Sequence, residues 1–420
     1  MEMNKRLIER FVYMNFELSN ENLQVKNMAK AIAEKEILEN VKYFEQERRF
    51  PKEILQKMGA AGLFGACFPE KYGGSEMGFL NLAIIAEEIS KAHPSFGYAF
   101  NMQAMTCPFT ILNWGTEEQI QKYVPDLIKA NLIGMFALTE SGGGSDPAGS
   151  MKTTARLDGN EYVINGSKTW ITFANEADVG VLFAKTDMKA GHKGISAFII
   201  ETNRPGFTAK PIEISSLGHM MRSCEVFLED YRIPKENLLG KEGEGFKIAM
   251  NALDYGRLTV SSRLVGIAQG CIDESIKYCN ERIVGGNPIG EYQMIKHLIA
   301  DMVVETDAAR LQTYRSAYLK DKGETATRES SYAKYFASEV AAKVSRNALE
   351  IFGGNGISDE YPIMKYVNYA NMLHFGEGSA NIQRILIAND ALGIKNANRH
   401  HIERRFALSS DITDEKKVRL

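Results

Sequence analysis

The chain has 420 residues, more than one typical hydrophobic core can serve, so we expect two or three packed units. Its 44% hydrophobic and 25% charged residues are ordinary for a globular protein and exclude a disordered or fibrous chain. With 50 basic and 53 acidic side chains the formal net charge is -3, which excludes the basic footprint of a nucleic-acid-binding protein.

Cysteine usage and the termini predict the compartment. Five cysteines, an odd number, fit a reduced protein better than a disulfide scaffold. Residues 1–18 contain several glutamates and no long apolar run, so they predict neither a signal nor a transit peptide. No stretch reaches the ~20 apolar residues of a membrane span, and no HExxH or paired CxxC motif predicts a metal site. We therefore expect a cytoplasmic protein without a membrane span or a metal.

The first region of the chain has helical patterning. Leu82, Ile85 and Ile89 recur at helical spacing, and Thr116 before two glutamates is typical of a helix start. From about residue 132 the pattern changes to short β-rich runs. Asp-Gly, Asn-Gly and Pro-Gly pairs separate these runs and predict turns. The sequence thus predicts a helical domain followed by a small β domain.

After Gly245 helical periodicity returns over long stretches, which is typical of a helix bundle. The order helices, strands, helices does not alternate as a doubly wound nucleotide-binding sheet would. The predicted division is an N-terminal extension (1–18), an N-terminal helical domain (19–131), a middle β domain (132–240), a C-terminal helical bundle (241–395) and a C-terminal tail (396–420).

Three separated motifs carry a family resemblance. The first is Phe136–Glu140, continuing through Ser145 and Asp146; its segment Thr139–Asp146 follows an apolar strand and offers backbone amides that can hold an anionic or polar cofactor. The second motif is Tyr162–Thr172, and the third is Glu377–Arg384. In their order and spacing, over about residues 20 to 395, these motifs resemble the acyl-CoA dehydrogenase family.

The resemblance implies an α+β fold with an N-terminal α-helical domain, a middle β-barrel domain and a C-terminal four-helix bundle, assembled as a homotetramer, a dimer of dimers, that binds FAD. It implies that some cofactor contacts reach across to a neighbouring subunit. The implied cofactor-binding residues are Phe136, Leu138, Thr139, Gly144, Ser145, Trp170, Ile171, Thr172, Arg282, Gln293, Glu350, Gly353, Gly354, Ser379 and Asn381.

Glu377 is the implied catalytic base. The α-proton of an acyl thioester is a weak acid, so a base has to remove it while hydrogen bonds at the carbonyl oxygen stabilise the enolate. Burial raises the pKa of a carboxylate, whereas the helix start at about Ser379 lowers it, and we expect burial to prevail. Some relatives carry the base on the long helix, where this chain has Gly256, so Glu377 has no rival.

The resemblance also implies substrate-binding residues, namely Ser145, Asp254, Arg257 and Gly378. Asp254 and Arg257 are three residues apart on a predicted helix, and a simple ion pair is an equally good interpretation. Trp170 and Thr172 are open to a second interpretation too, as a buried strand pair. His374 is expected to pack or to form a hydrogen bond rather than to act as a second base.

Three positions depart from the family pattern. Gly285 follows Arg282 where the family has Phe-Gly, which leaves the adenine pocket open to question. Gly376 replaces the tyrosine that usually precedes the base, so the pocket is expected to be wider there unless Phe375 or a methionine fills it. Residues 353–361 are similar to the glutaryl-CoA dehydrogenase subgroup, but Gly97 replaces the arginine that this subgroup uses for a distal carboxylate. On that ground we expect no dicarboxylic substrate.

The predicted reaction is FAD-dependent α,β-dehydrogenation of an acyl-CoA thioester, with electron-transfer flavoprotein as the implied electron acceptor. Two alternatives keep the same fold: desaturation of an acyl group on a carrier protein, or an oxidase that uses oxygen. A third, a flavoprotein scaffold without catalysis, is disfavoured because Glu377 is present.

Overall fold

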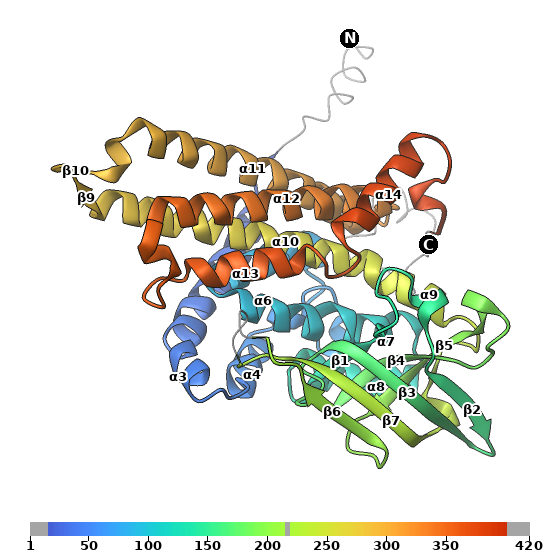
Figure 1. The fold of residues 1–420 in the computed structure, drawn as a ribbon. Coiled ribbons are helices and arrows are strands. Elements are labelled where there is room, and N and C mark those ends of the chain that lie inside the picture. Colours follow the sequence, from blue (N-terminus) through green and yellow to red (C-terminus); the bar gives the residue numbers. More distant parts are fainter. Residues whose placement is uncertain (1–15, 215–218, 401–420) are drawn as a thin grey trace, which may run out of the picture.

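The computed structural model describes residues 16–214 and 219–400. Most of the expected N-terminal extension and C-terminal tail lie outside these residues. Within the described part, no helix is both long and apolar enough to cross a membrane. Figure 1 shows a helical region, a sheet and a bundle of long helices, in that order along the chain.

The first region is a set of helices around a buried apolar core. Thr116 begins α8 with a capping box, in which its side chain and that of Gln119 each accept a hydrogen bond from the other residue's backbone amide. The helices are α2 (Asn20–Ile32), the π-helix η1 (Ala33–Leu38), α3 (Val41–Gln46), α4 (Lys52–Ala60), α5 (Gly78–Ala92), α6 (Pro94–Asn101), the π-helix η4 (Met102–Thr106), α7 (Pro108–Trp114) and α8 (Glu117–Ile128).

The middle region is an eight-stranded sheet in the order β6-β7-β3-β2-β4-β5-β8, with β1 pairing in parallel with β4. Most of its other pairs are antiparallel, so it is no doubly wound sheet. The elements are β1 (Gly134–Ala137), α9 (Pro147–Ser150), β2 (Thr154–Asp158), β3 (Glu161–Thr172), β4 (Val179–Lys185), β5 (Ile195–Glu201), β6 (Phe207–Pro211), β7 (Ser223–Pro234) and β8 (Leu238–Leu239).

One predicted turn in the sheet is wrong. Asn165-Gly166 lies inside β3, where the register against β7 shifts at a bulge. Asn165 accepts a hydrogen bond from the Asp230 amide at 2.8 Å and donates one to its carboxylate at 3.1 Å. The Asn-Gly pair therefore serves a bulge between two long strands and not a hairpin.

The third region is a bundle of long helices. Cys271 and Cys279 lie buried inside it as free thiols. Its helices are α10 (Gly245–Glu281), α11 (Gln293–Asp321), α12 (Thr327–Phe352), α13 (Ile363–Leu373) and α14 (Ala380–Ala391), and a short hairpin of β9 (Ile283–Val284) and β10 (Asn287–Pro288) joins α10 to α11.

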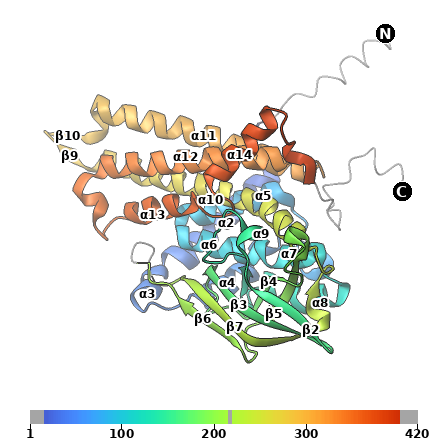
Figure 2. The same cartoon turned by 45° about the vertical axis from the view of Figure 1, so that its right-hand side comes forward.

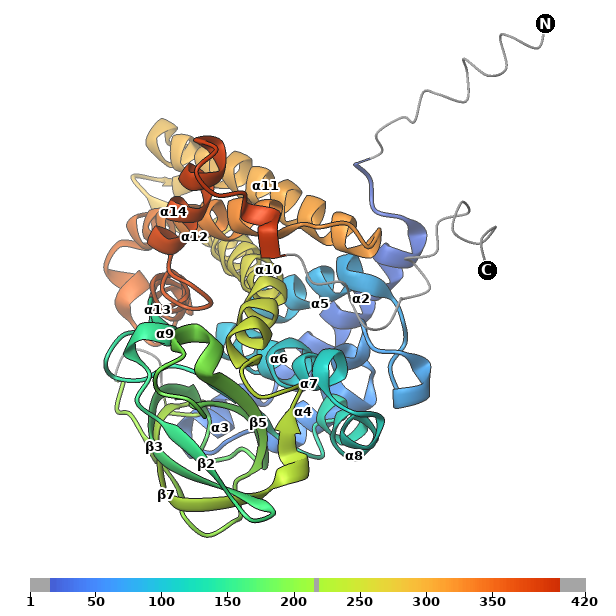
Figure 3. The same ribbon diagram turned by 90° about the vertical axis from the view of Figure 1, so that its right-hand side faces the viewer.

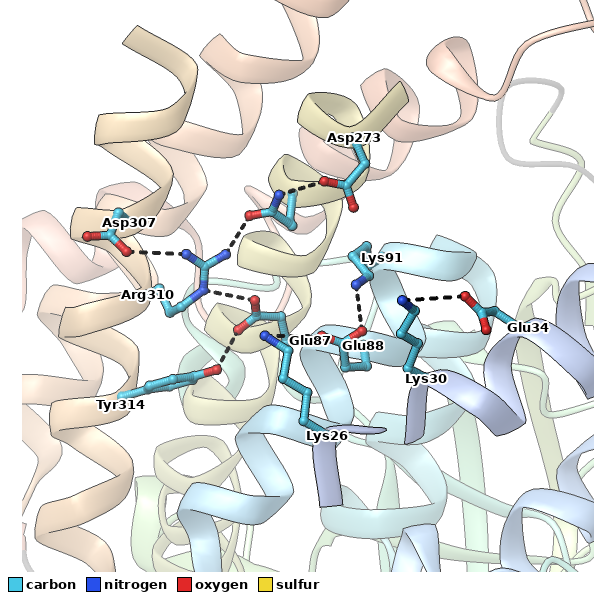
Figure 4. Close-up of polar contacts among 11 residues, drawn as sticks. Lys26, Lys30, Glu34, Glu87, Glu88, Lys91, Asp273, Asp307, Arg310 and Tyr314 are labelled. Atoms are coloured by element: carbon cyan, nitrogen blue, oxygen red, sulfur yellow. Dashed lines mark hydrogen bonds and ion pairs between the residues drawn. The ribbon is translucent and has the colours of Figure 1, made fainter. Parts of the chain in front are cut away.

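Helix α10 contacts all three regions: α5 in the first, β5 in the second and α12 in the third. The bundle lies above and the sheet below in all three ribbon views (Figures 1, 2 and 3). A buried polar network, shown in Figure 4, joins the first region to the bundle. Glu87 of α5 accepts hydrogen bonds from Arg310 and Tyr314 of α11, each at 2.9 Å.

Candidate active site

Glu377 lies in the loop between α13 and α14, with a backbone φ of 55°. A positive φ is uncommon outside glycine and costs on the order of 1–3 kcal/mol, so the surrounding structure has to hold it. Gly378 follows with φ 83°, and Ser379 caps α14 by accepting a hydrogen bond from the Ile382 amide. Glu377 as a whole residue is half-buried, whereas its carboxylate Oε2 is buried and has no hydrogen-bond partner in the described structure.

Residues of two helices, α6 and α10, hold the other carboxylate oxygen of Glu377, Oε1. Asn101 at the end of α6 donates a hydrogen bond from Nδ2 to Glu377 Oε1 at 3.0 Å, and Thr259 of α10 donates to Asn101 Oδ1. A Cβ atom at Gly256 would lie 2.6 Å from Glu377 Oε2. The position where some relatives carry their base is therefore the space into which Glu377 points, and any side chain there would displace the carboxylate.

Three buried cations surround Glu377, and two of them were not predicted. Arg257 and Arg263 come from α10, and Lys334 comes from α12. Lys334 is fully buried and donates a hydrogen bond to the carbonyl of His374 at 2.9 Å. Burial and the neighbouring Arg257 charge lower the pKa of Lys334 to about 7.

The pKa of Glu377 shifts in the direction that a base requires. Burial raises it above the ordinary value for a glutamate. The hydrogen bond from Asn101 and the charges of Arg263, Arg257 and Lys334 act in the opposite direction, and burial outweighs them. Glu377 is thus a buried carboxylate whose second oxygen is free to accept a proton.

Asp254 and Arg257 are more than a simple ion pair. Their closest charged atoms, Arg257 Nη1 and Asp254 Oδ1, are 3.9 Å apart, whereas Lys320 Nζ lies 2.8 Å from Asp254 Oδ2. Asp254 is thus paired mainly with Lys320. Arg257 is buried with Nε unpartnered in the described structure, and its charge acts on Glu377.

The first motif leads from β1 into an exposed loop. Phe136 and Leu138 are held in or near the core, while Gly144 and Ser145 are exposed. Behind them lies an ion pair between Lys168 Nζ and Glu140 Oε1 at 2.8 Å, with both side chains almost fully buried.

Two hydrogen bonds fasten this loop to β3. Thr139 accepts one from the Thr169 amide at 3.0 Å, and Lys168 donates one to the carbonyl of Leu138 at 3.2 Å. The first and second motifs therefore lie side by side, although they are separated in the sequence.

Trp170 does not form a buried strand pair with Thr172. The register of β3 against β7 shifts between Lys168 and Ile171, and Trp170 takes a φ of 61°. This bulge leaves Trp170 58% exposed, while Ile171 and Thr172 remain buried. An exposed indole beside exposed loop amides fits a planar, polar cofactor such as FAD.

Five other expected cofactor residues gather at the opposite end of the bundle, near the β9–β10 hairpin at the far left of Figure 1. Tyr278 of α10 stacks on Phe352 at the end of α12, with ring centroids 4.1 Å apart, and so brings the two helix ends together. The five residues are Arg282, Gln293, Glu350, Gly353 and Gly354, all exposed. One chain therefore holds its expected cofactor residues in two separate places.

The positions around the base leave open space. A Cβ atom at Gly376 would meet nothing within 4 Å. Phe375 is 72% exposed, and neither Met220 nor Met221 comes within 4 Å of that position. Asn381 is exposed in the first turn of α14, where its side chain accepts a hydrogen bond from Arg384.

Comparisons with known proteins agree with this architecture. Models of the acyl-CoA dehydrogenase N-terminal, middle and C-terminal domains match residues 19–131, 135–231 and 243–392. A glutaryl-CoA dehydrogenase of Desulfococcus multivorans is 41% identical over 392 residues, 92% of this chain and 100% of that protein. The mitochondrial short-chain specific acyl-CoA dehydrogenase of Mus musculus is 39% identical over 381 residues, 91% of this chain and 92% of that protein.

Solved structures show the same fold. A glutaryl-coenzyme A dehydrogenase in complex with glutaryl-CoA matches with a TM-score of 0.90 and 40% identity, over 93% of this chain and 100% of the other. The chain belongs to the acyl-CoA dehydrogenase family. It is an FAD-dependent oxidoreductase that dehydrogenates acyl-CoA thioesters.

Proposed function

We propose that Glu377 removes the α-proton of the acyl-CoA thioester. The observation that carries this role is the buried Oε2 atom, which has no hydrogen-bond partner in the described structure and belongs to a carboxylate with a raised pKa. Asn101 holds the other oxygen and so fixes the direction in which the free oxygen points. Arg257, Arg263 and Lys334 stabilise the negative charge that the site carries during turnover.

The cofactor surface is proposed to comprise the first two motifs, with Trp170 and Thr172 beside the flavin ring and the loop at Gly144 and Ser145 offering backbone amides. When bound, FAD supplies the acceptor for the hydride that leaves the β-carbon. The Glu377 amide is proposed to donate a hydrogen bond to the thioester oxygen, which is worth about 3 to 4 kcal/mol for one such donor. Ser379 and Asn381 complete the cofactor contacts.

The thioester and its pantetheine arm are proposed to lie along Ser145, Asp254, Arg257 and Gly378. Asp254 is held by Lys320 and Arg257 by its place on the long helix α10, so both are rigid parts of the channel. Rigid placement matters, because a small displacement of the α-carbon from the base is costly to the rate.

We infer that the working unit is a homotetramer, a dimer of dimers, because Arg282, Gln293 and Glu350 lie at the far end of the bundle from the first two motifs. In such an assembly these residues reach the cofactor of a neighbouring subunit. Arg282→Ala should weaken FAD retention by about 1.5 to 3 kcal/mol through loss of a charge-assisted contact. Unchanged FAD affinity would show that this contact does not exist.

We also propose electron-transfer flavoprotein as the electron acceptor, the cytoplasm as the compartment, and domain limits at 19–131, 132–240 and 241–395. The family matches do not favour a carrier-protein substrate or an oxidase. A screen of acyl-CoA thioesters for anaerobic bleaching of the flavin tests the function, with acyl-carrier proteins and oxygen as the comparison. Bleaching only by carrier-bound acyl groups, or rapid peroxide formation in air, would contradict it.

A further inference from the structure

Arg263 is a buried cation of the site, and two of its nitrogen atoms have no hydrogen-bond acceptor in the described structure. It lies on α10, its side chain is 1% exposed, and the two atoms are Nε and Nη2. Its guanidinium carbon lies 5.1 Å from the centre of the Tyr98 ring, which covers one face and accepts no directed hydrogen bond. Burial lowers the pKa of Arg263 to about 10, so the side chain remains a cation at neutral pH.

A second unpartnered donor lies beside it. Ser90 of α5 is fully buried, and its hydroxyl has no hydrogen-bond partner in the part of the chain that the structure describes. A Cβ atom at Gly97 would lie 1.9 Å from Ser90 Oγ and 3.4 Å from Arg263 Cγ. The glycine therefore lets α6, α5 and α10 come together around two buried donors for which the described residues supply no acceptor.

These donors lie beyond the base along α10. Gly256 marks the Glu377 carboxylate, and Arg263 is seven residues further on, about 10 Å along the axis at 1.5 Å per residue. Helical side chains lean towards the N-terminus of their helix, so the guanidinium comes closer to Glu377 than that. The charge of Arg263 accordingly acts on Glu377. A short acyl group that extended from Glu377 towards the C-terminal part of α10 would end near Arg263.

An unpaired buried charge is costly, and a buried donor without an acceptor costs about 1–3 kcal/mol. A ligand that brings a planar, negatively charged acceptor removes both costs, and a carboxylate matches the fork of a guanidinium. We propose that Arg263, with the Ser90 hydroxyl, binds a carboxylate at the end of a short acyl chain. The substrate class would then be CoA thioesters of short dicarboxylic acids.

This inference rests on the proposed function and narrows it. Gly97 on its own predicted that no dicarboxylic substrate would bind. A Cβ atom at Gly97 would lie 3.4 Å from Arg263 Cγ, so the stem of another arginine, from α10, passes beside the position that the subgroup's arginine occupies. Residue 263 lies far from residue 97 in the sequence, and the sequence pattern did not connect them.

The test compares two thioesters of equal shape on the full-length, FAD-loaded enzyme. Glutaryl-CoA carries the distal carboxylate, and isoheptanoyl-CoA has an isopropyl group in its place. We expect wild type to prefer glutaryl-CoA in kcat/KM, and Arg263→Gln to reduce the ratio of the two values by about 10- to 100-fold, as for loss of a charged hydrogen bond. Arg263→Lys should restore part of the ratio. Arg232→Gln, at an exposed arginine of β7, is the matched control.

Binding gives a readout that needs no turnover. In a Glu377→Gln background, the Kd for glutaryl-CoA, followed by the flavin spectrum, should rise about 10- to 100-fold on adding Arg263→Gln, and the Kd for isoheptanoyl-CoA should not. The unliganded Arg263→Gln protein should melt no lower than wild type, because it loses an unpaired buried charge.

Three results would overturn the inference. An equal fall for both thioesters would make Arg263 a support for the base only, and a clearly lower melting temperature would make it structural. If wild type reduced its flavin equally fast with isoheptanoyl-CoA and with glutaryl-CoA, the proposed carboxylate site would be wrong, and the proposed function would stand. If no acyl-CoA at all reduced the flavin, the proposed function would fail as well.

Discussion

Two clusters of buried charge lie on different sides of α10, and they differ in how completely their hydrogen bonds are made. In the first, both oxygens of Glu87 accept hydrogen bonds, and Arg310 also donates to Gln269 at 2.7 Å (Figure 4). In the second, Glu377 Oε2, Arg257 Nε and two nitrogens of Arg263 have no partner in the described structure.

The difference separates a structural role from a chemical one. A buried network in which the groups are paired rigidifies the fold, whereas unpaired buried groups cost stability. Proteins keep such costly arrangements where function requires them. The Glu87 cluster therefore holds two regions of the chain together. In the Glu377 cluster, we expect a bound substrate to supply the missing hydrogen-bond partners. Each of the following changes tests one side of this comparison.

The largest expected effect follows from Glu377→Gln. The amide fills the same volume but cannot accept the α-proton, so turnover should fall about 10²- to 10⁴-fold while the protein stays yellow. The measurements are steady-state rate and the flavin spectrum. A variant that kept more than a few per cent of the wild-type rate would show that Glu377 is not the base.

The same variant tests the stability cost through pH. Because the folded-state pKa of Glu377 is raised, its protonated form stabilises the fold, and this stability is lost as pH rises through the folded-state pKa. Gln has no such dependence. The melting temperature of Glu377→Gln relative to wild type should therefore rise as the pH increases above the ordinary pKa of a glutamate. A constant difference would contradict the raised pKa.

Removing a cation from the Glu87 cluster should lower the free energy of unfolding and leave the rate of dehydrogenation unchanged. Arg310→Met leaves Glu87 and Gln269 buried without their cation, which costs about 3–5 kcal/mol of unfolding free energy. Denaturant unfolding measures it. The control is Arg232→Met, which removes two exposed ion pairs, with Asp158 and Glu161, and should cost far less because exposed pairs contribute little. Equal losses in the two variants would remove the distinction drawn between the clusters.

Removing the hydrogen bond that Glu377 accepts from Asn101 tests how far this bond lowers the pKa of the base. Asn101 stabilises the charged form of the base, so Asn101→Leu should raise the pKa of Glu377 further. A charged hydrogen bond of about 1.5–3 kcal/mol corresponds to about one to two pH units in the rising limb of kcat/KM. Thr259→Val, which loosens Asn101, should give a smaller shift in the same direction. A shift of the rising limb to lower pH would show that Asn101 does not stabilise the charged form of Glu377.

Hydrophobic periodicity and helix-start patterns such as that at Thr116 predicted the helices–sheet–helices order, whereas Glu377 was proposed only because residues 377–384 resemble a family motif. The sequence did not reveal Asn101, Arg263 or Lys334 as neighbours of the base. Each is an ordinary helical residue on a different helix, or a different turn, and only packing brings them to one carboxylate. Trp170 was uncertain for a related reason, since its exposure depends on a bulge that is set by pairing with β7.

The smallest expected effect concerns the open space at Gly376, which has no counterpart in the closed Glu87 cluster. Apart from its two chain neighbours, no residue has an atom within 4 Å of a Cβ placed there, so we expect room beside the base for a branched or cyclic acyl group. Gly376→Tyr should fill this room and change the ratio of kcat/KM for a branched and a straight acyl-CoA by about 1 to 3 kcal/mol.

The comparison uses one pair of thioesters that differ only near the α-carbon, butyryl-CoA and its α-methyl derivative, so that contacts at the distal end cancel. Gly376→Ala is the matched control, because it places only a methyl group in the open position, whereas tyrosine adds a ring. Equal substrate ratios in wild type and Gly376→Tyr would show that the space is not part of the pocket. A fall in both rates without a change of ratio would mean that the ring disturbs Glu377, whose neighbouring backbone already holds a positive φ.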